Sequence, residues 1–364
     1  MNTNMTRRAF ATTLGTGALA ALAACGGSQT SGSGAATTSA ATGTAPAGGS
    51  VSVEMVTDTG GVNDQSFNQL AWQGMKKLES DNGWKVSYIE SKQDSDYATN
   101  LDKAVDDGSA LVWGIGFAMG EAVNTAAKQN PDVKFALIDS TNDSQASNLT
   151  GVLFKAAQPS FLVGYIAARM SQSGKVGFVG GMTSPTIQEF EYGYYAGIEY
   201  ANKEKGTTVT YKGQYAESFG DAGKGKAIAQ SMISDGCDVL YHAAGGTGVG
   251  MLEACNDANV YAIGVDQDQA ALFPDYKTII TSALKKVDEA VVSVSNGIMD
   301  GSIKGGGNIT LSAAEDAVGI APTHDKLPDD VYNDTLALLE KIKKGEVEVP
   351  ETEEQLKKFV EGLK

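Results

Sequence analysis

Cysteine and histidine are scarce in this chain. Besides Cys25 near the start, the only cysteines are Cys237 and Cys255, and the only histidines are His242 and His324. Three cysteines in 364 residues exclude a small scaffold held together by disulfides. No group of histidines and cysteines has the spacing of metal ligands, so we expect neither a metal nor another cofactor.

Positive charge is also in short supply. The chain has 28 lysines and arginines against 44 acids, a formal net charge of -16. Nucleic acid needs cationic partners for its phosphates, so we exclude it as a ligand. Direct binding to anionic lipid is disfavoured for the same reason.

Two catalytic motifs are missing or incomplete. There is no G-x-S-x-G sequence to support a serine nucleophile. Gly220–Lys226 fits G-x-x-x-x-G-K, but Ala227 stands where a Ser or Thr would hold Mg²⁺. These absences favour a binding protein over an enzyme.

The start of the chain has no hydrophobic run long enough to span a bilayer. The weakly apolar stretch 9–21 follows Arg7 and Arg8 and leads into Leu22-Ala23-Ala24-Cys25. Small residues before a cysteine are what a lipoprotein signal peptidase needs. We therefore predict a signal peptide over 1–24 and a lipid on Cys25 that holds the protein on the extracytoplasmic face of the cell membrane. Residues 6–10 also resemble a twin-arginine signal, which leaves the export route open.

Residues 25–50 are dominated by Ser, Gly, Thr and Ala and carry no charge. Such a segment cannot bury enough surface to fold, so we predict a flexible tether.

From Val51 onward, short apolar segments alternate with amphipathic helical segments in two successive series. This alternation predicts parallel sheets with right-handed crossovers, and the length predicts two lobes. The expected fold is α/β and type I periplasmic-binding-protein-like, with two doubly wound lobes joined by hinge crossovers. We assign 51–156 and about 284–316 to the N-terminal lobe, and 157–283 and about 317–364 to the C-terminal lobe.

Ligands of open parallel sheets bind at the carboxyl ends of the strands, where several loops here are unusually polar. Capping of the next helix would explain one polar residue after the first strand, but not so many together. A helix or turn cap remains an alternative for Asp139. In the N-terminal series the candidate ligand-binding residues are Asp58, Asn63, Asp64, Phe67, Asn68, Gly116, Phe117, Met119 and Asp139.

The second series contributes a matching set of strand-end residues. Phe219 offers a second aromatic ring, and a flat base between two rings finds π partners on both faces. Gly246 and Thr247 begin a helix whose free N–H groups suit a polar oxygen. Asp266 and Lys285 pair an acceptor with a donor, as vicinal hydroxyls require.

Together, the segments DTGGVNDQSFNQ, WGIGF, ALID, ESFGD, HAAGGTG, AIGVDQDQ and TSALKKVD resemble the basic membrane lipoprotein family over about 51–319. These are substrate-binding lipoproteins of ABC importers, and they include purine nucleoside receptors. The resemblance implies stacking of the base by Phe67 and Phe219, and binding of the ribose by Asp266 and Lys285. It implies that the polar residues of the first loop surround the base.

The resemblance favours capture of a nucleoside, a purine nucleoside in particular, by a monomeric protein that delivers it to ABC permease subunits. The alternative is a lipid-anchored sensor in which the closed complex informs a signalling partner.

Cys237 and Cys255 form a possible disulfide. Cys237 opens a predicted strand, and Cys255 lies near the end of the next helix, which returns beside that strand's start. Two buried free thiols facing different layers are the alternative.

Overall fold

The computed structural model describes residues 50–363, so the predicted signal peptide, Cys25 and nearly all of the predicted tether lie outside the described part. The described chain contains two six-stranded sheets, and each is the basis of one lobe. The first lobe has the order β11 (Asn308–Leu311), β5 (Leu149–Phe154), β4 (Lys134–Ile138), β3 (Leu111–Ile115), β1 (Ser52–Thr57) and β2 (Lys85–Ile89), all parallel.

The second lobe repeats this arrangement with one difference. Its order is β12 (Val318–Ile320), β10 (Ile279–Lys285), β9 (Tyr261–Asp266), β8 (Val239–Ala243), β6 (Lys175–Gly180) and β7 (Thr210–Tyr215). All neighbours are parallel except β12, which runs antiparallel to β10. The predicted α/β fold of two doubly wound lobes is therefore confirmed, with a short antiparallel edge strand that the sequence did not predict.

Helices cover both faces of each sheet because alternate strand side chains point in opposite directions. In β1, Met55 joins the apolar core beneath α1 (Phe67–Asn82) and α9 (Val287–Asp300). Its neighbour Val56 packs on the opposite face, against α2 (Tyr97–Asp106) and α3 (Gly120–Gln129). In the second lobe α4 (Ala157–Met170) and α5 (Pro185–Lys205) cover one face, and α6 (Ala222–Ser234) and α7 (Gly245–Ala258) cover the other.

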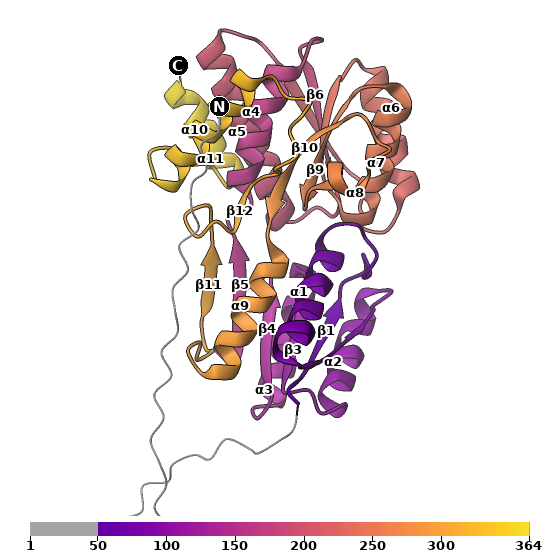
Figure 1. Cartoon of the computed structure of the whole chain (residues 1–364), viewed down its shortest axis with the longest axis vertical. Coiled ribbons are helices and arrows are strands. Elements are labelled where there is room, and N and C mark those ends of the chain that lie inside the picture. The colour runs from indigo at the N-terminus through magenta and orange to yellow at the C-terminus, as the bar shows by residue number, and fades with distance from the viewer. Residues whose placement is uncertain (1–49, 364) are drawn as a thin grey trace, which may run out of the picture. The chain divides into compact units, whose positions relative to one another are not determined.

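The chain passes between the lobes after β5, after β10 and between β11 and β12 (Figure 1). The segment after β10 returns to the first lobe as α9, which packs on α1, and continues into β11. These crossovers bring the carboxyl ends of the two sheets to the same cavity.

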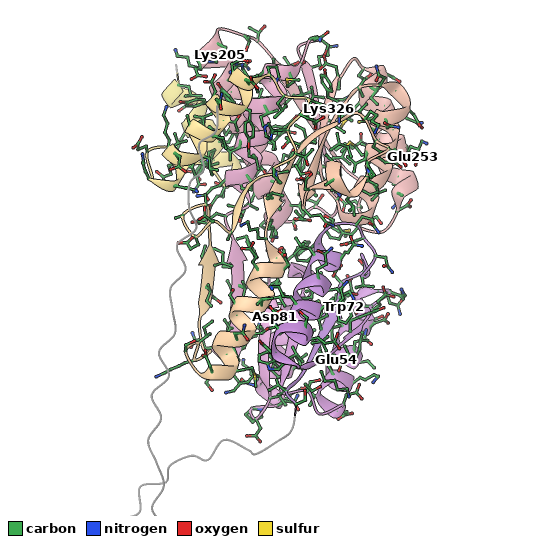
Figure 2. The ribbon with its side chains drawn as sticks, in the orientation of Figure 1. Glu54, Trp72, Asp81, Lys205, Glu253 and Lys326 are labelled. Atoms are coloured by element: carbon green, nitrogen blue, oxygen red, sulfur yellow. The ribbon has the colours of Figure 1, made fainter. Side chains whose placement is uncertain are left out.

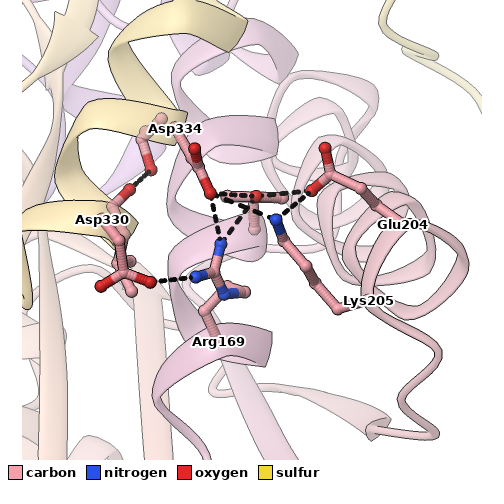
Figure 3. Close-up of polar contacts among 8 residues, drawn as sticks. Arg169, Glu204, Lys205, Asp330 and Asp334 are labelled. Carbon is pink, nitrogen blue, oxygen red and sulfur yellow. Dashed lines mark hydrogen bonds and ion pairs between the residues drawn. The ribbon is translucent and has the colours of Figure 1, made fainter.

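The helices α10 (Asp329–Lys343) and α11 (Glu353–Leu363) pack on α4 and α5 of the second lobe. Figure 3 shows how charge fixes α10 there. Arg169 of α4 donates to Asp330 at 2.7 Å and to Asp334 at 2.9 Å, and Lys205 of α5 lies 3.2 Å from Asp334.

In the second lobe α6 and α7 approach each other backbone to backbone. A side chain at Gly225 would meet the carbonyl oxygen of Thr247 at 1.9 Å, so only glycine fits. Across the same contact Lys226 pairs with Glu253 at 2.8 Å, and Glu253 is labelled at the outer side of this lobe in Figure 2. The pair of helices thereby supports the loops at their N-terminal ends, which face the cavity.

Both described cysteines are free and buried, so the disulfide considered above is not formed. Cys255 lies in α7 with its Sγ 3.5 Å from the sulfur of Met251, and Cys237 lies before β8 begins. Within residues 50–363, no helix has the length and apolar character needed to cross a membrane.

Candidate functional site

A cavity lies between the lobes, where the carboxyl ends of the two sheets meet. Its lining comes from both lobes: Asp58, Asp64, Phe67, Asn68, Gly116, Phe117, Asp139, Ile187, Phe190, Phe219, Ala243, Ala244, Gly245, Val265, Asp266 and Lys285.

The loop between β1 and α1 forms one wall through a closed set of hydrogen bonds. Asp58 accepts from the backbone N–H of Gly60 at 2.9 Å and from Asn68 Nδ2 at 2.8 Å. Asp64 accepts from the backbone N–H groups of Ser66, Asn68 and Gln69 at 2.8–3.0 Å. Asp64 therefore caps the start of α1 and also lines the cavity, so one residue has both a capping role and a place in the site.

Asn68 is 1% exposed, and its Oδ1 has no hydrogen-bond partner within the described chain. Its Nδ2 is already engaged by Asp58 and Asp64. A buried amide oxygen without a donor is costly, so a ligand N–H or O–H in the cavity would relieve that cost.

Two strand-end acids hold unusual backbone conformations. Asp139 has φ +63° and Asp266 has φ +64°, in the left-handed region that disfavours residues with a side chain. Both carboxylates are bound across the cleft: Asp139 pairs with Lys285, and Asp266 accepts from the hydroxyl of Ser66. At both positions the strained backbone conformation therefore occurs together with a side-chain contact to the other lobe.

Lys285 is 2% exposed and lies among aromatic rings. Its Nζ lies 4.8 Å from the ring centroid of Phe67, 5.1 Å from Phe154 and 5.5 Å from Phe190. The sequence led us to expect Lys285 to act together with Asp266. The structure gives Lys285 a direct bond to Asp139 instead, and its charge acts on Asp266 only through space.

Burial dominates the electrostatics of the acids in the cavity. It raises the pKa of Asp58 to about 7, and the hydrogen bonds from Gly60 and Asn68 offset only part of that rise. Burial also raises the pKa of Asp64, and it raises that of Asp266 to about 6 against the opposing charge of Lys285. The lining carries four carboxylates and one ammonium group, so it favours a ligand that donates hydrogen bonds over a phosphorylated one.

The aromatic rings are distributed differently from the simple sandwich expected. Phe219 meets Phe117 of the other lobe edge to face, with ring centroids 6.1 Å apart and planes at 72°. Phe67 lies beneath Lys285. All three rings line the same cavity, so each can offer a face or an edge to a flat ligand.

The remaining candidates lie outside the lining. Asn63 is exposed, and Gly246 lies behind Phe219 and Asp64. Met119 is fully buried in the core formed with α2 and α3, because the turn after Gly116 directs it under the sheet. Thr247 is also fully buried.

Thr247 supports the loop that carries Phe219. Its Oγ1 donates to the Ser218 carbonyl at 2.9 Å, and its backbone N–H donates to the Phe219 carbonyl at 3.0 Å. The residue sits behind the site and holds one of its rings in place.

Sequence reasoning missed the apolar part of the lining. Ile187 and Phe190 lie on α5 at positions that have the same pattern as core residues, so only the tertiary fold brings them to the cavity. Gly245 was missed by one position; its φ of +52° places backbone in the wall.

Two further observations bear on the chemistry of the site. His242 is fully buried, its Nε2 lies 2.9 Å from Oε1 of Gln269, and burial lowers its pKa to about 4. It is therefore a neutral hydrogen-bonding residue near physiological pH. Among residues 50–363, no cluster of three or more His, Cys, Asp or Glu side chains could hold a metal ion.

Residues 51–353 match the family described as ABC transporter substrate-binding protein, PnrA-like. Basic membrane protein A of Borreliella burgdorferi is 37% identical over 313 residues, which cover 85% of this chain and 90% of that protein. The ABC transporter nucleoside-binding protein BmpA of Lactococcus lactis subsp. cremoris is 36% identical over 285 residues, covering 73% and 80%. A solute-binding protein of an ABC transporter system from Aeropyrum pernix superposes with a TM-score of 0.77 at 28% identity, covering 86% of this chain and 97% of that one.

Proposed function

Because this chain belongs to the family of PnrA-like ABC transporter substrate-binding proteins and has their type I periplasmic-binding fold, we propose that it captures a nucleoside between its lobes and delivers it to permease subunits. We favour a purine nucleoside. The name of the Lactococcus relative, which is a nucleoside-binding protein, supports this ligand class. The ligand leaves unchanged, since transport requires no bond to be broken.

The observation that carries the proposal is the composition of the cavity. Phe67, Phe117 and Phe219 provide ring surfaces for a base, whereas Asp266 and Lys285 at the other strand ends provide an acceptor and a donor for hydroxyl groups. A free base alone would leave Asp266 and Lys285 without hydroxyl partners.

Calorimetric titration of the purified protein tests this directly. The panel is adenosine, guanosine, uridine, cytidine, adenine, guanine, AMP and arabinose. We expect one nucleoside per chain, with purine nucleosides tightest, free bases weaker, and AMP weaker still because four carboxylates line the cavity. Binding of arabinose alone, or release of free base from a bound nucleoside, would contradict the proposal.

Removing an aromatic ring should weaken nucleoside binding. Phe219→Ala and Phe67→Ala should each cost about 1–3 kcal/mol of binding free energy, the usual value of a base–aromatic stack. Phe273→Ala is the matched control, because Phe273 stacks on Tyr276 in the second lobe and does not line the cavity. Full guanosine affinity in the Phe67→Ala/Phe219→Ala double variant would show that the rings do not hold the base.

We further propose that a lipid on Cys25 anchors the protein on the extracytoplasmic face of the membrane. Cys25→Ser should then move the protein from the detergent phase to the aqueous phase in a phase-separation assay. Cys237→Ser leaves the signal intact and should not change the partition. Retention of Cys25→Ser in the membrane fraction would argue for a different anchor.

A further inference from the structure

Two short segments of opposite lobes are hydrogen-bonded directly to each other beside the cavity. They are Gln65–Gln69, at the start of α1, and Asp266–Gln269, at the end of β9. Gln267 Nε2 donates to Gln69 Oε1 at 3.1 Å, and Gln269 Nε2 donates to the Gln65 carbonyl at 3.0 Å. Ser66 of the first segment also donates to Asp266 of the second.

Hydrogen bonds within the second lobe fix the orientation of its side of this contact. Gln269 is fully buried, and its Oε1 accepts from the Val265 backbone N–H at 3.0 Å and from His242 at 2.9 Å. Its own backbone N–H donates to Ser282 Oγ at 3.0 Å. With the amide oxygen engaged, Nε2 of Gln269 is left pointing at the first lobe.

The first lobe presents a matching acceptor through its backbone. Gln65 has φ +56°, in the left-handed region that is unfavourable for glutamine, and its carbonyl accepts the bond from Gln269. Neither Gln65 nor Gln69, Gln267 or Gln269 lines the cavity. The two glutamine bonds of the contact are therefore made by residues outside the cavity lining.

We propose that Gln65–Gln69 and Asp266–Gln269 form a cross-lobe latch in which Gln69, Gln267 and Gln269 are positioning residues that set how long a ligand is retained. A ligand enclosed between lobes can leave only when they part, so bonds that hold them together slow its release. The same bonds raise the closed fraction of the ligand-free protein, which raises the apparent affinity. Because Ser66 bonds Asp266, which lines the cavity, closure also orients that carboxylate toward the ligand.

The Gln69–Gln267 bond offers the cleanest test, since both side chains are only partly buried. Stopped-flow displacement of guanosine should show dissociation about 2- to 10-fold faster in Gln69→Ala and in Gln267→Ala, the range for one neutral hydrogen bond. The double variant should match either single variant, because the two substitutions remove one shared bond. Gln230→Ala, at an exposed position on α6, is the control and should leave the rate unchanged.

Restoring a cross-lobe pair should restore retention. Gln69→Glu combined with Gln267→Lys places opposite charges at the same positions and should slow dissociation relative to either single charge variant. Unchanged dissociation in the alanine variants, or additive effects in their double variant, would overturn the proposal.

The dissociation measurement rests on the proposed nucleoside function, so a second readout avoids any ligand. Fluorophores at Lys128→Cys and Lys224→Cys, exposed positions in opposite lobes, report the distance between the lobes by energy transfer in the ligand-free protein. Gln267→Ala should increase the mean distance. If guanosine does not bind, the nucleoside proposal fails while this distance still tests the latch. An unchanged distance, or a longer distance without faster release of bound guanosine, would overturn the latch proposal.

Discussion

Lys285→Met should lower the free energy of unfolding by about 3–5 kcal/mol, the usual cost of breaking a buried ion pair by removing one partner. The side chains of Lys285 and Asp139 are 2% and 8% exposed, so the remaining carboxylate would stay buried without its counter-ion. The substitution also removes the cation–π contacts of Lys285 with the rings of Phe67, Phe154 and Phe190. Urea denaturation of the ligand-free protein measures the change.

Two further variants make this result specific. Lys285→Met with Asp139→Asn removes both charges and should recover most of the lost stability, because no unpaired charge remains. Lys286→Met is the matched control: Lys286 is a third exposed and pairs with the exposed Glu289, so its loss should cost less than about 1 kcal/mol. An equal loss at both lysines would show that the Lys285–Asp139 pair is not special.

Asp58→Asn should stabilise the ligand-free protein at pH 8 by about 2–4 kcal/mol, given about 1.4 kcal/mol per unit of pKa shift. Burial raises the pKa of Asp58 from an ordinary 3.8 to about 7. Above that pH the folded protein must hold a buried anion that the unfolded chain holds in water. Asparagine keeps an oxygen that can accept from Gly60 and Asn68 and carries no charge.

The same shift predicts how stability depends on pH. Between about pH 4 and 7 the folded state keeps a proton on Asp58 that the unfolded state has lost, so stability falls as the pH rises through this window. Asp266, with a pKa of about 6, and Glu189, with a pKa raised by burial to about 7, act in the same direction. His242 opposes them below about pH 6.5, because its folded pKa of about 4 lies below its ordinary value.

Melting temperatures from pH 5 to 8 therefore provide the measurement. The protein should lose stability toward pH 8, and Asp58→Asn should flatten that loss. Asp132→Asn, an exposed acid of the same lobe, should leave the curve parallel to that of the unaltered protein. If the Asp58→Asn curve is parallel as well, Asp58 does not carry the raised pKa.

Local sequence pattern was enough to predict the architecture. Short apolar strands and amphipathic helices each have a hydrophobic periodicity that can be recognised within the segment alone. The carboxyl ends of parallel strands lie on one side of the sheet, so the residues that follow them can be predicted to lie together. Asp58, Phe67, Asp139, Phe219, Asp266 and Lys285 were therefore found as strand-end residues before any fold was known, and all of them line the cavity.

Only the tertiary structure decided how these residues combine. Lys285 bonds Asp139 across 146 residues and Ser66 bonds Asp266 across 200, and both pairs depend on where the chain crosses between the lobes. The fold also placed Met119 in a core and set Thr247 behind Phe219. A residue's type and spacing determine which bonds it can make, whereas crossover geometry determines which partner comes within reach.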